Sequence, residues 1–114
     1  MAGSYVPDRG DIVWLQFNPQ AGHEQAGHRP AFVVSPRAYN QKVGLALFCP
    51  ITTRQRGYPF EVALPVDGKA QGAILSDQLK SLDWKAGKAA RFDRAPAYVV
   101  AEVTARILPL VDPE

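Results

Sequence analysis

Prolines and glycines interrupt this sequence so often that few long regular elements can fit between them. The chain carries ten prolines and nine glycines in 114 residues. Proline removes a backbone hydrogen-bond donor, and glycine weakens the interior of a helix or a strand. The apolar runs left between these residues are short and rich in β-branched and aromatic side chains, which favours strands joined by turns over a helical bundle.

Five of these runs predict strands. In "DIVWLQF" (11–17), alternation divides the side chains between two faces, and we expect Trp14 to pack in the core or at an interface. The segment 18–30 has no apolar period and is expected to be a long loop, and such loops are more often functional than idle. Strands are expected at 11–17, 31–35, 44–51 and 60–64 and at the start of 73–84.

Only the C-terminal region has helical spacing. Asp93 is expected to cap a helix that has Pro96 in its first turn, and Pro109 limits how far the helix can run. Its expected apolar face comprises Val99, Val103, Ile107 and Leu110. The pattern of about five strands followed by one helix predicts a mainly β (α+β) class or an all-β barrel.

Length and composition set further bounds. A chain of 114 residues fits one domain, expected to span 1–114, and 46% hydrophobic with 21% charged residues is typical of a globular protein. One cysteine allows no internal disulfide, which favours a reducing compartment. We find neither a signal peptide nor an apolar run of the ~20 residues that a membrane helix needs, so we expect a cytoplasmic protein without a membrane partner.

The net charge of +2 is too small to predict nucleic-acid binding by itself. Its distribution is more informative, because Arg54 and Arg56 share one turn and five cations lie within 80–94. Phosphate binding is favoured if these clusters meet the segment of Arg29 in space.

Two segments carry groups suited to an oxyanion. In "EQAGHRP" (24–30), Pro30 biases Arg29 toward extended geometry at the start of a strand, and a guanidinium held there suits phosphate. The competing interpretation is an exposed Glu24–Arg29 pair of little energetic value. In "PITTRQRGYP" (50–59), hydroxyls and backbone N–H groups at a strand end can hold an oxyanion.

Other chemistries find weaker support. His23, Glu24, His28 and Cys49 do not have the spacing of a zinc site, and a small buried residue is the expected role of Cys49. Ser35 and Ser76 lack the local signature of a nucleophile elbow. We therefore expect no metal and no cofactor.

These segments resemble the MazF/PemK family of bacterial toxin endoribonucleases. The matching stretches are collinear from Tyr5 to about Trp84, and they are "RGDIVWLQFNP" (9–19), "EQAGHRPAFVVSP" (24–36), "YN" (39–40), "PITTRQRGYPFEV" (50–62) and "SDQLKSLDW" (76–84). The resemblance implies a small SH3-like or CcdB-like antiparallel barrel with a C-terminal helix, acting as a homodimer. It also implies metal-independent, sequence-specific cleavage of single-stranded RNA (mRNA), and a cognate antitoxin with a disordered acidic C-terminal segment.

The resemblance implies roles for individual residues. Arg29 would bind the non-bridging phosphate oxygens, Thr52 would donate a hydrogen bond to the same phosphate, and Glu24 would act as general base. His28 is a supporting residue, either as an acid or by orienting the loop through a hydrogen bond, and Thr53 is a second supporting residue. The residues expected to hold RNA are Phe17, Arg54, Arg56, Gln78 and Lys80, with Phe17 stacking on an unpaired base.

One departure from the family pattern and two rival functions remain. Gln16 and Asn18 stand where the family often has acidic residues, which removes negative charge near the groove. A CcdB-like toxin of the same fold would bind a topoisomerase and cleave nothing, and a non-catalytic RNA-binding barrel is the third possibility. The joint presence of "GHRP" and "PITT" favours the nuclease.

Overall fold

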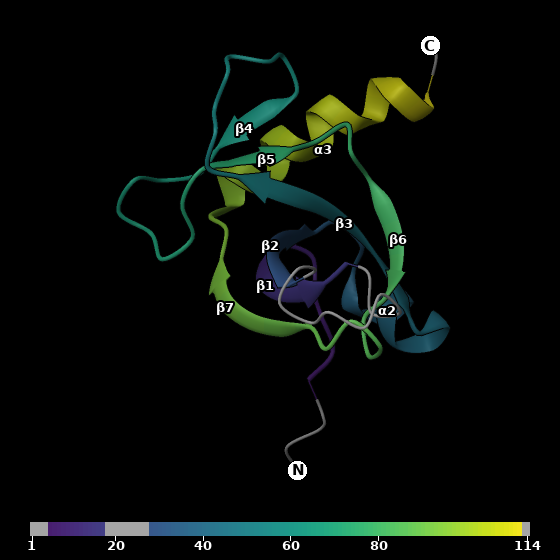
Figure 1. The fold of residues 1–114 in the computed structure, drawn as a ribbon. Helices are drawn as coiled ribbons and strands as arrows, with labels where there is room; N and C mark the ends of the chain where they lie inside the picture. Colours follow the sequence, from purple (N-terminus) through teal and green to yellow (C-terminus); the bar gives the residue numbers. More distant parts are fainter. Residues whose placement is uncertain (1–4, 18–27, 113–114) are drawn as a thin grey trace.

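The sheet is organised by one central strand that pairs along both of its edges. The computed structural model describes residues 5–17 and 28–112. Its strands are β1 (Asp11–Gln16), β2 (His28–Val33), β3 (Leu45–Thr52), β4 (Glu61–Ala63), β5 (Ala73–Leu75), β6 (Lys80–Asp83) and β7 (Ala90–Arg94), and its helices are α2 (Arg37–Val43) and α3 (Ala97–Val111). The antiparallel order is β4-β5-β3-β2-β1-β7, and β6 also pairs with β3 (Figure 1).

The expected class, mainly antiparallel β with a C-terminal helix, is confirmed, with three differences in the sheet. In the part of the chain that the structure describes, β4 and β7 end the pairing path, so the sheet is curved but not closed into a barrel. The strand expected at 31–35 begins earlier, at His28, because its first residues pair with β1. The structure also adds β7, which the sequence did not predict.

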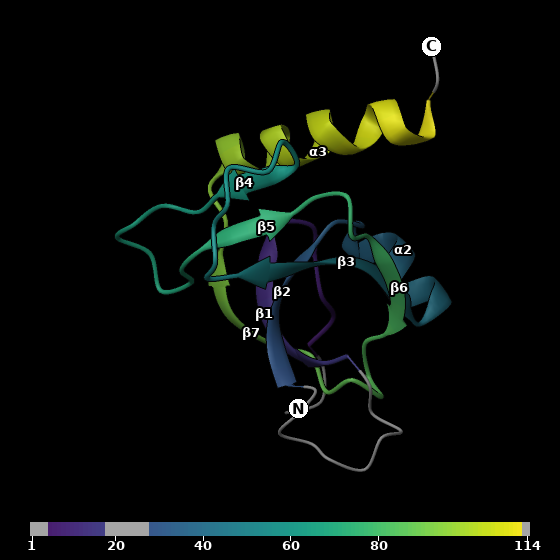
Figure 2. The same cartoon turned by 45° about the horizontal axis from the view of Figure 1, so that its top comes forward.

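Strand alternation sorts the apolar side chains into two cores, one on each face of the sheet. In β1, Ile12 belongs to the first core, whereas Val13 and Leu15 belong to the second. Figure 2 shows α3 beside β4 and β5, where it covers the first core. The second core, named here for later use, consists of Val13, Leu15, Ala31, Val33, Ala46, Phe48 and Trp84.

The C-terminal helix is held by one apolar face. Val99, Val103 and Ile107 are buried as expected, each contributing ~1.5–3 kcal/mol, but Leu110 is 54% exposed. The helix begins at Ala97 after an extended Pro96, without a side-chain cap.

The expected cap at Asp93 is wrong, because this residue lies in β7. Its Oδ2 instead accepts the backbone N–H of Ala70 at 2.8 Å, which ties β7 to the turn at 67–72. The sequence around Asp93 is the same as that of a helix cap, but its carboxylate accepts a hydrogen bond from a backbone N–H that is distant in sequence.

A buried asparagine joins the N-terminal segment to α2. The Asn40 amide donates to the carbonyls of Pro7 (2.7 Å) and Ser35 (2.9 Å), and its backbone carbonyl accepts Trp84 Nε1 at 2.9 Å. All of these polar groups are thereby satisfied away from water.

No helix among residues 5–17 and 28–112 is long and apolar enough to span a membrane.

Asp11 is a buried carboxylate that links three segments. It is 1% exposed, and its Oδ2 accepts the hydroxyl of Tyr5 at 2.7 Å and the N–H of Asp8 at 3.0 Å. Its Oδ1 accepts Arg94 Nη1 at 2.6 Å from β7. Burial and the hydrogen bond to Asp11 raise the pKa of Tyr5 well above its ordinary value, so the phenol remains a donor at neutral pH.

We predict that Asp11→Ala lowers the free energy of unfolding by about 3 kcal/mol, because three donors lose a buried acceptor. The low end of the range for buried pairs applies since Arg94 is half exposed. Glu102→Ala is the control: it breaks an exposed pair with Arg106 of similar length (2.7 Å) and should cost at most ~0.5 kcal/mol. Urea unfolding followed by tryptophan fluorescence measures both, and equal losses would contradict the prediction.

Candidate functional site

Arg29 and Thr52 lie on two neighbouring strands, β2 and β3. The register sets Ala31 opposite Pro50, and each of the two residues lies two positions beyond this last printed pair. Residues two apart on a strand share a face, and residues directly opposite in an antiparallel pair share it too. Both side chains therefore belong to the face of the second core, where Arg29 also lies opposite Leu15 of β1.

Thr52 ends its strand under a close backbone approach. It is half-buried, it pairs with Ala73, and its Oγ1 accepts the N–H of Arg54 at 3.1 Å. Gly72, at φ +109°, lies so close that a Cβ there would overlap the Thr52 carbonyl oxygen and lie 2.9 Å from the carbonyl carbon. The position of Thr52 thus depends on a glycine twenty residues along the chain.

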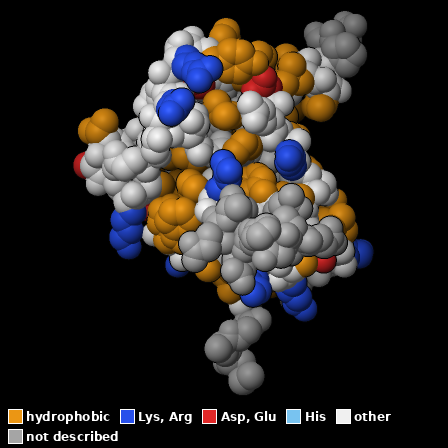
Figure 3. All heavy atoms as spheres, in the orientation of Figure 1, with side chains coloured by type: hydrophobic (Ala, Val, Ile, Leu, Met, Phe, Trp, Pro, Cys, Tyr) orange, Lys and Arg blue, Asp and Glu red, His pale blue; other side chains and the backbone are white. Residues whose placement is uncertain are grey.

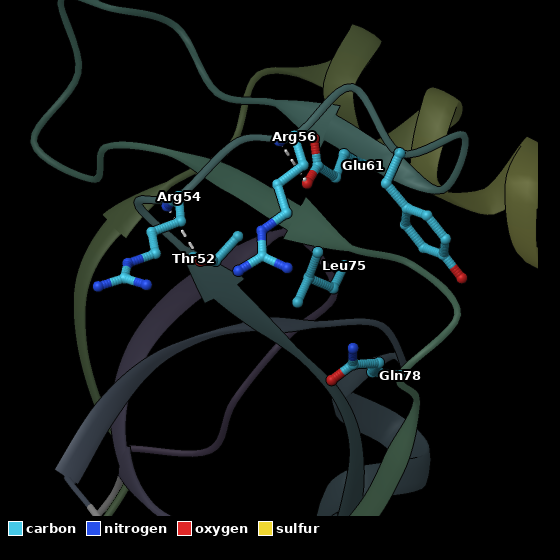
Figure 4. A pocket seen from close by; sticks show the side chains of 7 residues that line it. Thr52, Arg54, Arg56, Glu61, Leu75 and Gln78 are labelled. Atoms are coloured by element: carbon cyan, nitrogen blue, oxygen red, sulfur yellow. Dashed lines mark hydrogen bonds between the residues drawn. The ribbon is translucent and has the colours of Figure 1, made fainter.

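Thr52 forms one wall of a pocket of about 460 Å³. Figure 4 shows the Arg56 side chain pointing into this pocket, toward Leu75 and Thr52, while Arg54 points to its outer edge. The residues that line it are Thr52, Arg54, Arg56, Tyr58, Glu61, Leu75 and Gln78. Four of them, namely Thr52, Arg54, Arg56 and Gln78, were predicted as site residues, and the fold brings them together.

Hydrogen bonds from neighbouring segments hold the backbone of the loop that carries Arg54 and Arg56. Glu61 accepts the backbone N–H of Arg56 with both carboxylate oxygens at 3.1 Å, and that of Gly57 at 3.1 Å. The Tyr58 hydroxyl donates to Asp77, which ties the loop to the β5–β6 connection and raises the pKa of Tyr58. An exposed arginine is thereby presented from an ordered backbone rather than from a loose loop.

Sequence analysis missed Tyr58, Glu61 and Leu75. The sequence gave no sign that the Glu61 carboxylate would accept hydrogen bonds from loop N–H groups. A carboxylate that follows a Gly-Tyr-Pro turn is the weak signal that was present. Only closure of the loop reveals the interaction.

The other predicted residues are more dispersed. Phe17 is half-buried against the second core, Lys80 begins β6 opposite Phe48, and Thr53 is exposed directly after β3. Glu24 lies outside the described residues. His28 is the first residue of β2, so alternation turns it to the face opposite Arg29.

On that opposite face, Trp14 is less buried than expected. It is 38% exposed and stacks on Phe92 of β7, with ring centroids 4.7 Å apart and planes at 19°. The imidazole of His28 packs against the same indole at 5.3 Å. Of the two roles expected for Trp14, packing in the core is wrong, because no described residue fully covers its ring, whereas packing at an interface stays a prediction.

The cationic clusters converge only in part. Arg54 and Arg56 share the pocket, whereas in the second cluster Arg94 is bound to Asp11 and Lys85 lies 5.9 Å from the centre of the Trp84 ring. Figure 3 shows Lys and Arg side chains around the middle of the face seen in Figure 1, with hydrophobic side chains between them. A polyanion laid on this face would meet cations and apolar surface together.

The described residues contain no group of three or more His, Cys, Asp and Glu side chains that could hold a metal ion. Cys49 is fully buried in β3, as expected, and burial raises the pKa of its thiol to about 12. It is therefore an apolar core residue in chemical terms.

Comparisons with known proteins agree with this geometry. A family model described as "PemK-like, MazF-like toxin of type II toxin-antitoxin system" matches residues 8–111. The chain is 52% identical over 86 residues to the endoribonuclease toxin MazF of Escherichia coli K12, which covers 75% of this chain and 77% of that protein. It is 39% identical over 112 residues to the endoribonuclease toxin ChpB of the same organism, covering 92% of this chain and 94% of that one.

Solved structures give the same result. A MazE–MazF structure from Deinococcus radiodurans matches with a TM-score of 0.85 at 45% identity, covering 96% of this chain and 98% of that chain. A structure of MazF from the same organism also gives a TM-score of 0.85, here at 52% identity, with 95% and 98% covered.

We predict that Gly72→Ala distorts the Thr52 wall of the pocket. Gly57→Ala is the matched control: Gly57 also has positive φ (+73°), but nothing lies within 4 Å of an added Cβ. Both variants carry backbone strain of ~1–3 kcal/mol, and Gly72→Ala should lose a further ~1–3 kcal/mol of unfolding free energy through overlap with β3. The amide NMR chemical shifts of residues 51–53 should change in Gly72→Ala and not in Gly57→Ala. Unchanged chemical shifts of these residues in Gly72→Ala would contradict the prediction.

Proposed function

This chain belongs to the PemK-like, MazF-like toxin family of type II toxin–antitoxin systems, and we propose that it is an endoribonuclease that cleaves single-stranded RNA, mRNA included, without a metal ion. The observation that carries the proposal is that Thr52 lines a pocket together with Arg54 and Arg56, and alternation assigns Arg29 of the neighbouring strand to the same face of the sheet. The proposed place of action is the cytoplasm.

The proposed reaction is an internal phosphoryl transfer. The ribose 2′-oxygen forms a bond to the phosphorus, the bond from phosphorus to the 5′-oxygen breaks, and the products are a 2′,3′-cyclic phosphate and a 5′-hydroxyl. Because DNA lacks the 2′-hydroxyl, the nucleophile also selects RNA. Glu24 takes the 2′-hydroxyl proton in this scheme, a role carried over from the family motif that it shares, and the departing 5′-oxygen takes a proton from water.

Arg29 and Thr52 suit the charge that develops in this reaction. A guanidinium stays protonated at neutral pH and offers paired N–H donors to the non-bridging oxygens. The Thr52 hydroxyl has its oxygen engaged by the N–H of Arg54, which leaves its proton available to the same phosphate. Donors fixed before the reaction lower the barrier without reorganisation.

The pocket and its surroundings suit the rest of the RNA. We assign strand binding to Phe17, Arg54, Arg56, Gln78 and Lys80, with support from Thr53. The exposed cations contribute salt-dependent attraction for phosphates, and Phe17 offers an aromatic ring at the edge of the second core. The apolar Leu75 side chain lets a base lie between charged neighbours.

An antitoxin is the proposed protein partner, in line with the MazE–MazF structure that matches this chain. A disordered, acidic C-terminal antitoxin segment would be attracted to the cations that also attract RNA, so the two would compete. A homodimer is the proposed assembly, as implied by the family.

We predict that Arg29→Ala and Thr52→Ala each lower the RNA cleavage rate by ~10²–10³-fold, since each removes a donor to the transition-state phosphate. Glu24→Gln should lower it by ~10²–10⁴-fold. Arg91→Ala, which removes an exposed arginine from β7, is the control and should cleave normally. The assay uses a long single-stranded RNA in EDTA, with end analysis for 5′-hydroxyls.

The stability of Arg29→Ala should change by less than ~0.5 kcal/mol, because an exposed arginine fills no core volume. Intact RNA after incubation with the unmodified protein would exclude the nuclease and favour the rival topoisomerase-binding toxin of the same fold. Fragments that persist in Arg29→Ala would exclude the proposed role of this arginine.

A further inference from the structure

Helix α3 contacts the loop that carries the two pocket arginines, residues 53–60, named here the arginine loop. Arg106 donates a hydrogen bond from Nη1 to the backbone carbonyl of Pro59, which lies 47 residues earlier in the chain. Its Nη2 donates to Glu102 Oε2 at 2.7 Å, one helical turn before it. The two acceptors together fix the direction in which the guanidinium leaves the helix, because its N–H groups form a rigid planar fork.

The part of α3 from which Arg106 extends is firmly packed. Its neighbours Val103 and Ile107 are buried in the first core. Figure 2 shows α3 beside β4, the strand that follows the arginine loop. Close packing lets the helix shift only if side chains of the core shift as well, so Arg106 offers the loop a fixed point of attachment.

Pro59 belongs to a turn that hydrogen bonds close at Arg56. The Glu61 carboxylate accepts the backbone N–H of Arg56 with both oxygens at 3.1 Å. Residues 56–61 therefore form a closed turn, in which a shift of the Pro59 carbonyl also shifts the backbone of Arg56. Figure 4 shows that the Arg56 side chain points from this turn into the pocket whose wall includes Thr52.

We propose that Arg106 is a positioning residue: its guanidinium holds the closed turn at Pro59 and thereby keeps the Arg56 side chain in the pocket. The inference rests on the proposed function for its effect on RNA binding. The described residues that line the pocket do not include Arg106, so it acts through Arg56. A contact that RNA uses equally in the ground state and the transition state changes KM and leaves kcat as it is.

The charge of Arg106 supplies a competing explanation that can be tested. Any exposed cation attracts a polyanion over roughly a Debye length, about 8 Å at physiological ionic strength, whatever it does for the loop. An effect of charge alone would be similar for another exposed arginine and would add to the loss of Arg56. An effect of positioning would vanish once Arg56 is gone.

The experiment measures steady-state RNA cleavage by Arg106→Ala, Arg56→Ala and the double variant, with Arg91→Ala on β7 as the charge-matched control. We expect Arg106→Ala to raise KM ~3–10-fold at an unchanged kcat, the size expected for one hydrogen bond from a charged donor at the surface. In the Arg56→Ala background the same substitution should leave KM unchanged. Arg91→Ala should change KM by less than ~2-fold.

Amide hydrogen exchange of Arg56 and Gly57 adds a readout that needs no RNA. Both N–H groups donate to the Glu61 carboxylate at 3.1 Å. Loss of the attachment at Pro59 should quicken their exchange ~3–10-fold in Arg106→Ala and leave it unchanged in Arg91→Ala. The buried helix around Val103 should keep its slow exchange in both variants, which shows that α3 stays folded.

Three results would overturn the proposal. A rise in KM in Arg106→Ala that multiplies with that of Arg56→Ala would show that Arg106 attracts RNA by its own charge. Unchanged exchange at Arg56 and Gly57 would show that Arg106 does not hold the turn. A lower kcat with unchanged KM would assign Arg106 to folding or to the chemical step. If the unmodified protein cleaves no RNA, the proposed function fails, whereas the exchange measurement still decides whether Arg106 holds the turn.

Discussion

The register between β2 and β3 is the constraint on which the site depends. Ala31 faces Pro50 because the side chains around them fill two cores, and slippage by one residue would turn buried apolar groups of β2 to the wrong face. The same slippage would turn Arg29 away from the face that it shares with Thr52. The face on which Arg29 lies is therefore set by the burial of side chains such as Phe32 elsewhere along the strand.

The two faces of the sheet carry different groups of side chains. Alternation assigns Arg29 and Thr52 to the face of the second core, and the rings of His28, Trp14 and Phe92 pack on one another on the opposite face. The arginine loop follows a similar principle, because its order comes from the Glu61 carboxylate and not from contacts of the guanidinium groups. At this loop, neighbouring residues restrict the backbone while the Arg56 side chain points into the pocket.

Local patterns predicted the strands at 11–17 and 44–51 well, since β-branched and aromatic residues there are bounded by turn formers. They failed at β7, where "ARFDR" reads as a charged segment and Asp93 as a helix cap; pairing with β1 and a hydrogen bond from Ala70 decide its structure. Alternation predicted the two faces of β1 but could not reveal that Trp14 would remain partly exposed. The motifs predicted Thr52, Arg54, Arg56 and Gln78 as site residues, and these four line one pocket. The contact of Tyr58 with Asp77 joins distant segments, and the hydrogen bonds of Glu61 depend on how its loop folds back, so no local pattern encodes them.

The close approach of Gly72 to Thr52 has a consequence for how such a sequence can diverge. Position 72 contacts the threonine through backbone alone, so it carries no chemistry that substitution could improve, yet any side chain there displaces the strand end. Position 72 therefore tolerates almost no substitution. The exposed loop at 53–58, which surrounds the same pocket, can vary in charge and length. Related sequences can thus change which groups the pocket accepts, provided that residue 72 stays a glycine and places only a hydrogen atom beside Thr52.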